Sequence, residues 1–362
     1  MKYLNILLVF AAVAVVAELA GWNPTLVFVA SGLAMIPLAG LMGQATEVLA
    51  AHTGPRLGGL LNATLGNAAE LIITILAIRE GLLNPAINDH MLDLVRASLT
   101  GSILGNILLV LGLSILLGGL KHGTQKFDRS HSGLNATMLM LAAAALVIPS
   151  IFGLSIEAVD HDAVEYLSLG VAAVMIVLYV LALVYQLRNP GAHTLDDDQY
   201  AVAKEEAPHW SLRRAAIMLV LATGGIVWMA EILVGSVEHV VLELGVSQFF
   251  LGIIIIPIIG NVAEHLVAVQ VAIKNKMELS LAISVGSSLQ IALFVAPLLV
   301  FISLLMGNPM TLVFNQFELI AMMAAVLIAG MVSLDGRSNW LEGAMLSALY
   351  VIIALAFFWL AI

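Results

Sequence analysis

The sequence predicts an all-α integral membrane protein of about eleven transmembrane helices, arranged as one peripheral helix plus two inverted five-helix repeats. Three observations lead to this prediction. Of the 362 residues, 61% are hydrophobic and only 10% are charged, which is far from the balance of a soluble domain. Apolar runs of about 17–27 residues recur along the chain, and about 20 apolar residues can cross a bilayer as a helix. Finally, lysine and arginine fall almost entirely on one side of the predicted membrane.

The apolar runs define the predicted spans. They lie near residues 4–20, 25–51, 59–79, 91–117, 133–152, 163–187, 211–236, 246–274, 278–304, 315–334 and 341–361. Several are longer than a bilayer needs, so we expect tilted, broken or extended helices. The first run is preceded by a single basic residue, Lys2, and lacks a small-residue cleavage site. We therefore interpret it as a retained helix rather than a secretion signal.

The distribution of basic residues tests this count. Twelve of the fourteen lysine and arginine residues lie on the same side of the predicted membrane as the N-terminus, and only Arg79 and Arg96 lie on the other. The positive-inside rule places the N-terminus in the cytoplasm and, after eleven spans, the C-terminus outside. The net charge of −10 and the lack of a basic run predict no nucleic-acid partner. The absence of cysteine excludes disulfides and thiolate chemistry.

One long polar segment, residues 188–210, divides the chain and carries three consecutive aspartates. Before it we expect a peripheral helix over residues 1–23 and a first five-helix repeat over residues 24–187. After it we expect a second five-helix repeat over residues 211–362. Because five crossings is an odd number, the second repeat must enter the membrane inverted relative to the first, as in many secondary transporters. The segment between them would be an acidic cytoplasmic linker.

Two matching pentapeptides place a carboxylate inside an apolar run in each half of the chain. The first, Gly-Asn-Ala-Ala-Glu, ends at Glu70, and the second, Gly-Asn-Val-Ala-Glu, ends at Glu264. A glutamate at the centre of a membrane helix costs about 2.5–3.5 kcal/mol on insertion scales, and Glu70 lies about 16 Å into its span. Asn67 and Asn261 stand three residues earlier, on the same helix face as the glutamate that follows. We interpret the two motifs as halves of one ion site.

Further oxygen ligands are predicted from the next span of each half. Ser102 and Ser287 each follow a glycine at matching places, with Asn106 and Gln290 on the same helix faces. The glycine of each pentapeptide, preceded in the second by Pro257, is expected to break its helix and free backbone carbonyls. A site of hard oxygens with two negative charges suits Ca²⁺. Mn²⁺ is the second candidate, and Mg²⁺ fits less well because it gives up water reluctantly.

Two opposed carboxylates can be neutralised by one divalent cation or by protons, and these states exclude each other. Because the empty, doubly charged site is too costly to reorient, this exclusivity is the minimum that antiport requires. Glu47 and Glu231 match between the halves and lie toward opposite membrane faces. We predict that they are entrance residues; the alternative is that each is an interfacial residue in contact with water. For His265 and Glu318, we weigh a proton-relay or transport role against a buried hydrogen bond or a structural pairing.

These residues resemble those of a known family. The motifs around Glu70 and Glu264, the stretch Gly-Ser-Ile-Leu-Gly-Asn at 101–106 and the stretch from Asp335 to Gly343 look like those of calcium/proton antiporters of the cation/calcium exchanger superfamily. The resemblance covers nearly the whole chain. It implies the inverted-repeat fold and the export of cytosolic Ca²⁺ in exchange for H⁺, with these ions as substrates and no cofactor.

The resemblance also implies roles for individual residues. The cation ligands that it implies are Glu70, Glu264, Asn67, Asn261, Ser102 and Ser287. The two glutamates would also take up the protons. A microbial plasma (inner) membrane fits better than a vacuolar or other organelle membrane, because there is no long N-terminal regulatory tail and the acidic linker is short. The sequence leaves the oligomeric state open.

Two other functions remain alternatives. The sodium/calcium branch, driven by Na⁺ or K⁺, usually places a proline directly before the motif glutamate. Here Ala69 and Ala263 hold that position, which favours protons. A membrane-embedded metal-dependent enzyme would need a nucleophile or a closed metal set, and the sequence contains neither His-Glu-X-X-His nor Gly-X-Ser-X-Gly.

Overall fold

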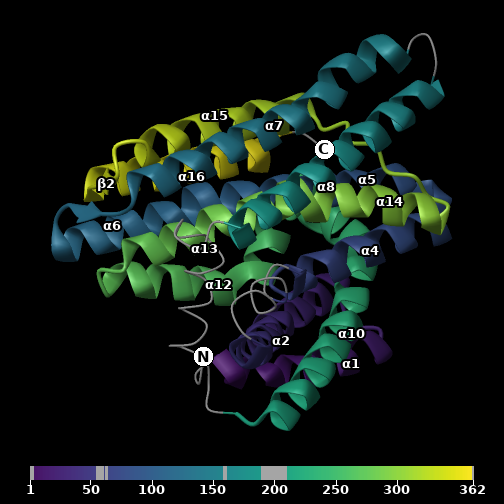
Figure 1. Cartoon of the computed structure of the whole chain (residues 1–362). Helices are drawn as coiled ribbons and strands as arrows, with labels where there is room; N and C mark the ends of the chain where they lie inside the picture. Colours follow the sequence, from purple (N-terminus) through teal and green to yellow (C-terminus); the bar gives the residue numbers. More distant parts are fainter. Residues whose placement is uncertain (1–3, 54–60, 62–63, 158–160, 189–209, 361–362) are drawn as a thin grey trace. The chain divides into compact units, whose positions relative to one another are not determined.

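The computed structural model describes residues 4–53, 61, 64–157, 161–188 and 210–360, and nearly all of them are helical (Figure 1). The longer helices are α1 (Val9–Leu19), α2 (Pro24–Thr53), α4 (Ala68–Leu83), α5 (Asn88–Leu104), α6 (Leu111–His122), α7 (Arg129–Glu157), α8 (His161–Arg188), α10 (Leu212–Leu244), α12 (Ile256–Ile273), α13 (Met277–Gln290), α14 (Ala296–Met306), α15 (Gln316–Ser333) and α16 (Trp340–Trp359). The shorter elements are the 3₁₀-helices η1 (Leu4–Leu8) and η2 (Pro85–Ile87), the one-turn α11 (Gln248–Phe250), the π-helices η3 (Gly105–Val110), η4 (Leu251–Ile255) and η5 (Ile291–Val295), and the strands β1 (Gln125–Lys126) and β2 (Arg337–Ser338).

The predicted all-α membrane fold is confirmed. In the described part of the chain, nine helical segments are long and apolar enough to cross a bilayer, and each overlaps one predicted span. The two remaining predicted spans correspond to the shorter helices at Leu4–Leu19 and Ala68–Leu83. Some segments run beyond the predicted ends, as Leu212–Leu244 does, because helices continue past the apolar core of a bilayer.

The chain forms two compact units. Unit 1 comprises Met1–Ser98, Gln199–Leu266 and Ala354–Ile362, and unit 2 comprises Leu99–Asp198 and Val267–Ile353. Each unit therefore takes segments from both predicted repeats. The division into repeats follows the chain rather than these units and remains a prediction, and residues 189–209 of the predicted linker lie outside the described residues.

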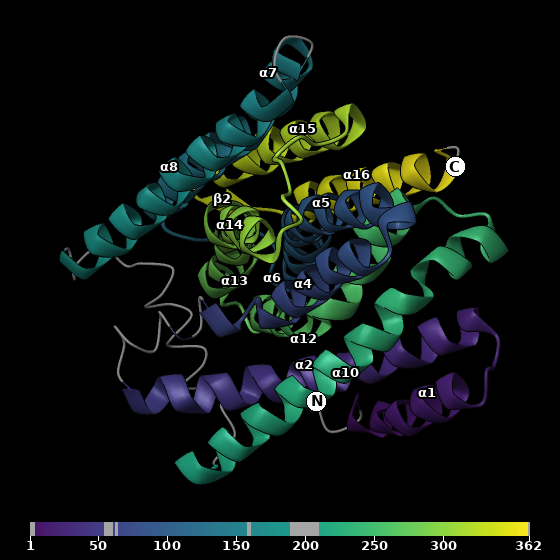
Figure 2. The same ribbon diagram turned by 90° about the vertical axis from the view of Figure 1, so that its right-hand side faces the viewer.

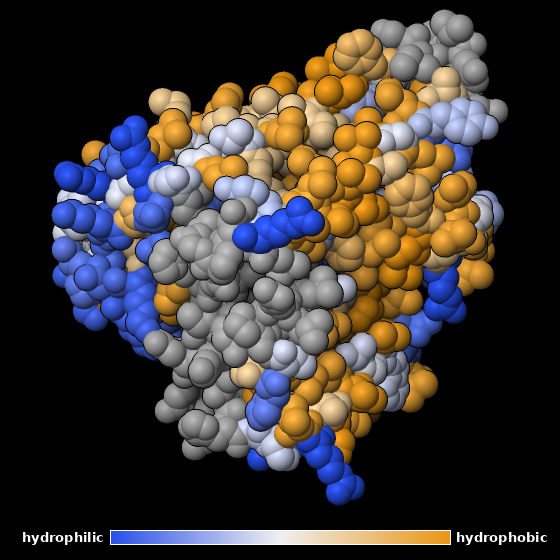
Figure 3. All heavy atoms as spheres, in the orientation of Figure 1, coloured by the Kyte–Doolittle hydropathy of each residue, from blue (hydrophilic) through white to orange (hydrophobic). Residues whose placement is uncertain are grey.

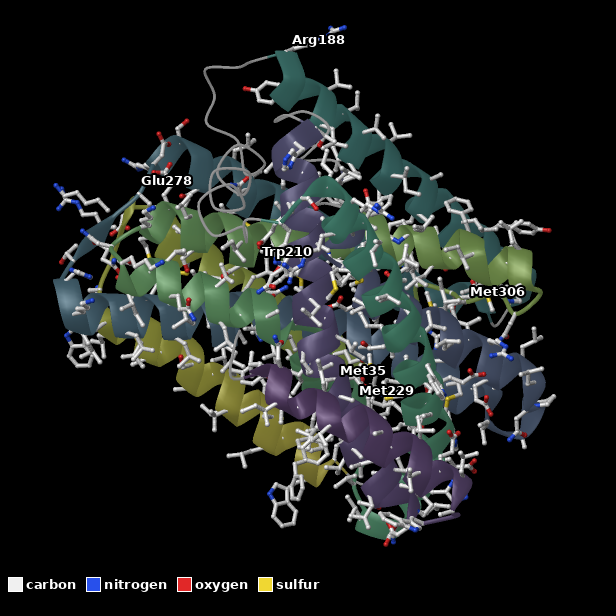
Figure 4. The ribbon with its side chains drawn as sticks, turned by 90° about the horizontal axis from the view of Figure 1, so that it is seen from below. Met35, Arg188, Trp210, Met229, Glu278 and Met306 are labelled. Atoms are coloured by element: carbon white, nitrogen blue, oxygen red, sulfur yellow. The ribbon has the colours of Figure 1, made fainter. Side chains whose placement is uncertain are left out.

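In unit 1, α2 and α10 pack against each other where they cross, with α1 against α2 and α4 against α10 (Figures 1 and 2). Figure 4 shows Met35 of α2 and Met229 of α10 where these two helices cross, and both side chains are buried. The approach is close because Gly225 has no side chain: a Cβ there would lie 2.9 Å from Cδ2 of Leu38. The helix that carries Glu70 thus packs against α10.

In unit 2, α13 packs against α6, η3 and α7, while α15 lies beside α7 and α14 beside α8. The two short strands pair antiparallel, with Gln125 opposite Ser338. A capping box is present at the start of α16, because the Asn339 side chain accepts the amide of Glu342 and the Glu342 carboxylate accepts the amide of Asn339. The stretch from Asp335 to Gly343, which resembles a motif of the family, therefore forms a turn and the start of a helix.

Gly343 lies where α16 meets α6. A Cβ at this position would lie 2.6 Å from the carbonyl oxygen of Gly112 and would collide with the amide nitrogen of Leu116. Because backbone atoms cannot rotate away, we expect Gly343→Ala to destabilise unit 2 by about 2 kcal/mol and to lower the melting temperature in detergent by about 5 °C. Gly170→Ala on α8, where a Cβ meets nothing within 4 Å, is the control. Equal melting temperatures for the two variants would contradict the close contact of α6 and α16.

Large apolar side chains cover the outer faces of several helices. On α8, Val174, Val177 and Leu181 are more than half exposed, as are Val220 and Leu221 on α10. Figure 3 shows hydrophobic residues over a broad part of the visible surface. Continuous apolar surface of this kind is rare on soluble monomers and suits contact with lipid.

Candidate ion-binding site

The first pentapeptide interrupts a helix, as predicted. Thr64 and Leu65 are helical, Gly66 and Asn67 form a turn, and α4 starts at the next residue. Asn67 is the N-cap of α4, with φ −97° and ψ 20°. Glu70 consequently lies in the first turn of α4, where the unpaired amide groups of a helix carry partial positive charge. This position favours the ionised carboxylate.

The second pentapeptide does not interrupt its helix, and the predicted break at Gly260 is wrong. α12 runs without interruption from Ile256 to Ile273. The irregularity lies one turn earlier, in the π-helix η4, and Pro257 is the second residue after it. A proline cannot donate the hydrogen bond of a regular helix, and a π-helical turn just before it changes the bonding pattern at that place. The extra carbonyl ligands expected at Gly260 are therefore held in α-helical bonds.

The two pentapeptides meet inside unit 1. A Cβ on Gly260 would lie 3.3 Å from Oε1 and 3.4 Å from Cδ of Glu70, so the carboxylate of the first motif lies against the glycine of the second. The Asn261 side chain and the Glu264 carboxylate are both close enough to act electrostatically on Glu70. The structure thus brings Glu70, Asn261 and Glu264 together.

Burial makes the charge of Glu70 costly. Its side chain is 2% exposed, and Asn67 and Asn261 are 1% exposed, whereas Glu264 is half-buried. Within the described residues, no basic side chain forms an ion pair with Glu70. A buried carboxylate beside a second one needs a cation or a proton to offset its charge.

The predicted ligands of the following spans lie in unit 2. Nδ2 of Asn106 donates a hydrogen bond to Oγ of Ser287 over 3.1 Å, although the two residues are 181 positions apart. Ser102 is 1% and Gln290 8% exposed. In both halves the helix changes from α to π just beyond the serine, at η3 and at η5. Such π-helical turns are frequent at functional sites.

Glu231 has a partner that the sequence did not reveal. It forms an ion pair with Arg79 over 2.9 Å, and both side chains are about half exposed. Arg79 lies on α4, nine residues after Glu70, and is one of only two basic residues on the predicted outer side. This rare position was the feature of the sequence from which an acidic partner could have been expected. Glu47, on α2, is half-buried. The entrance role of the two glutamates remains a prediction.

The two remaining candidates differ in their surroundings. Glu318 is 1% exposed and completes a capping box at the start of α15, where its Oε2 accepts the amide of Asn315 over 2.9 Å. This contact is the structural pairing weighed above. His265 is half-buried beside Glu264 on α12. No group of three or more histidine, aspartate and glutamate side chains that could hold a metal occurs among the described residues, so a cation at Glu70 would need amide, hydroxyl or carbonyl oxygens as well.

Comparisons with known proteins identify the family and the fold. The model of the sodium/calcium exchanger protein family matches residues 23–188 and 214–359. The chain is 43% identical to a Ca²⁺/H⁺ antiporter of Synechocystis sp., over 99% of this chain and 97% of that protein. It is 38% identical to a vacuolar calcium ion transporter of Schizosaccharomyces pombe, over 99% of this chain and 85% of that protein.

The fold has a solved relative as well. The structure of native YfkE superposes with a TM-score of 0.84 at 41% identity, covering 99% of this chain and 100% of that one. The resemblance to antiporters of the cation/calcium exchanger superfamily is thereby confirmed, and the chain is a transporter rather than an enzyme. From the paired motifs, the helical membrane fold and these matches, we conclude that the chain belongs to the sodium/calcium exchanger family.

Proposed function

We propose that this protein exchanges cytosolic Ca²⁺ for H⁺ by alternating access at a site built on Glu70 and Glu264. The observation that carries the proposal is the meeting of the two pentapeptides, in which the buried Glu70 carboxylate lies against Gly260 and close to Glu264 without a basic partner among the described residues. The Synechocystis relative, a Ca²⁺/H⁺ antiporter by name, supports the choice of ions.

The donor set fits a calcium ion. Two carboxylates supply charge that matches a divalent cation, and the amide oxygens of Asn67 and Asn261 are the hard ligands that Ca²⁺ prefers. Ser102 and Ser287 remain predicted hydroxyl ligands, and Asn106 donates a hydrogen bond to Ser287. Mn²⁺ accepts the same oxygen ligands and is the second candidate substrate.

The coupling follows from charge. With Ca²⁺ bound, the two carboxylates are neutralised by the ion; with protons bound, each is neutral by itself. The empty site would carry two negative charges in a low-dielectric interior, which is too costly for reorientation. The binding site therefore changes the side of the membrane to which it opens only when it holds one substrate or the other, and this produces obligatory exchange.

The proposed location is a microbial plasma (inner) membrane, with the N-terminus in the cytoplasm and the C-terminus outside. The one-sided distribution of basic residues supports this orientation, and the bacterial relative is consistent with the location. Because the relative from Schizosaccharomyces pombe is a vacuolar transporter, an organelle membrane is the alternative.

Everted membrane vesicles test the driving ion. With an acid interior, we expect Ca²⁺ uptake that needs no Na⁺ and that a protonophore abolishes. Alanine at the positions before both motif glutamates, Ala69 and Ala263, supports protons over the Na⁺-driven or K⁺-driven alternative. Vesicles lacking the protein are the control. Equal uptake driven by a Na⁺ or K⁺ gradient at fixed pH would reject proton coupling.

A further inference from the structure

Unit 2 contains a line of buried hydroxyl groups that extends away from the Asn106–Ser287 pair. On α13, Ser280, Ser284 and Ser287 stand at i, i+4 and i+7 and therefore share one helix face. The first two are 0% and 1% exposed, and their hydroxyls make no hydrogen bond with any residue that the structure describes. Ser288, on the same helix, instead bonds to the carbonyl of Ser284 one turn back, which is the usual outlet for a helical serine.

Both ends of this line are joined to the segment that runs through η3 and α6 to β1. At one end, Asn106 of η3 donates to Ser287. At the other, Nε2 of Gln125 in β1 donates over 3.0 Å to the carbonyl of Ala272, near the end of α12, and over 3.0 Å to Oδ1 of Asn275, in the connection that leads into α13. The η3–α6 segment therefore runs antiparallel to α13 and packs against it.

The α6 side adds unpartnered polar atoms at intermediate levels. Ser114 is fully buried, and neither its hydroxyl nor Oε1 of Gln125 bonds to a described residue. The Gln125 oxygen lies against Gly118, one helical turn from Ser114. Measured from the Asn106–Ser287 pair, Ser114 lies about 12 Å along its helix and Ser280 about 10 Å along α13. These two hydroxyls are therefore at about the same level.

Unpartnered buried polar atoms in this number call for a ligand. More than nine in ten buried polar groups in proteins have a hydrogen-bond partner, and a water molecule in a protein interior needs two to four polar contacts. The residues of the line are Gln125, Ser114, Ser280, Ser284, Ser287 and Asn106, and none carries a charge. A divalent cation would lack an offsetting carboxylate there, whereas water suits hydroxyl and amide groups.

We propose that this line binds a file of water molecules that carries protons between the α12–α13 connection and the Asn106–Ser287 pair. The inference rests on the proposed function, because it supplies a route for the protons of a proton-coupled exchanger. Protons would pass along hydrogen-bonded water and hydroxyl groups, each of which accepts one proton as it donates another. Ca²⁺ would not use this route.

Charged groups stand at the end of the line near the α12–α13 connection rather than within it. Lys121 and His122, at the end of α6, contact the last carbonyl of α12 over 3.2 Å and 2.8 Å. Glu278 lies on the opposite face of α13, where it lines a pocket with groups of α7 and α15, and a neighbouring pocket joins it to Lys126 and Lys276. Protons entering the line would exchange with water among these groups.

The test compares two substitutions whose new side chains have the same shape. Valine and threonine differ only in whether a methyl or a hydroxyl group occupies one branch, so Ser284→Val removes the hydroxyl that Ser284→Thr keeps. In vesicles we expect the valine variant to slow pH-driven Ca²⁺ uptake about tenfold, the effect of one lost hydrogen bond in the rate-limiting step. Exchange of labelled for unlabelled Ca²⁺ at fixed pH, which needs no proton movement, should stay unchanged. The same pair at Ser280 should behave alike, and Ser288→Ala should leave both rates unchanged.

Three results would overturn the proposal: an unchanged rate of pH-driven uptake in the valine variants, equal slowing of pH-driven uptake and Ca²⁺ self-exchange, or slowing by threonine as strong as that by valine. The last two would assign the hydroxyls to the cation path or to packing. Absence of pH-driven uptake by the unaltered protein would instead reject the proposed function, so the two failures are distinguishable.

Discussion

Replacing Glu70 or Glu264 by glutamine is expected to reduce Ca²⁺ uptake in vesicles to the level of membranes without the protein. Glutamine keeps the shape of the side chain but carries no charge to balance a divalent cation and takes up no proton in this pH range. Loss of either carboxylate therefore removes cation binding and proton coupling together. Insertion should be retained, because an amide is cheaper to bury than a carboxylate.

Stability separates this loss from misfolding. Glu70 is buried without an ion-pair partner among the described residues, so Glu70→Gln should raise the melting temperature in detergent. The half-buried Glu264 should respond less when replaced. Glu80→Gln, ten residues further along α4 and away from the pentapeptides, is the matched control and should transport normally. Near-normal flux in either Glu70→Gln or Glu264→Gln would contradict a shared two-glutamate site.

Enlarging Gly260 is expected to weaken Ca²⁺ binding through Glu70. Because a Cβ would stand 3.3 Å from Oε1 of Glu70, Gly260→Ala forces the carboxylate to shift by a few tenths of an ångström. We expect the KM for Ca²⁺ to rise about tenfold, since small misplacements of a binding group have effects of this order. Gly260→Val has branches that reach further toward the carboxylate and should abolish uptake.

A glycine in open space provides the comparison. Gly235 on α10 has no atom within 4 Å of an added Cβ, so Gly235→Ala should leave the KM unchanged. Alanine favours the helix by about 1 kcal/mol over glycine, so a drop in stability should not accompany either alanine variant. An unchanged KM in Gly260→Val would show that the contact between the two pentapeptides has no part in Ca²⁺ binding.

The helical membrane fold was predictable because hydrophobicity acts over long, continuous stretches. Each of the eleven predicted spans has a helix in the structure, since a chain in lipid must satisfy its backbone hydrogen bonds internally. Local chemistry was predictable for the same reason at short range. The turn at Gly66 and Asn67 and the capping box of Asn339 and Glu342 depend only on neighbouring residues.

Predictions that depended on packing were less complete. The break expected at Gly260 is absent, because the π-helix η4 lies before Pro257 and α12 continues unbroken beyond it. The partner of Glu231, Arg79, lies 152 positions away, and no periodicity of the sequence connects the two. The hydroxyl of Ser284 is ordinary in the sequence and unusual only once its burial and lack of a partner among the described residues are known.

The sequence by itself determined that this chain crosses a membrane many times and that two glutamates stand inside it, because hydropathy and insertion cost are properties of single residues and of short segments. Only the tertiary structure decided that Glu70 lies against Gly260 and near Glu264, and that Glu70 is fully buried while Glu264 is half-buried. Such contacts form when helices pack side by side, and the distance between residues along the chain does not control them.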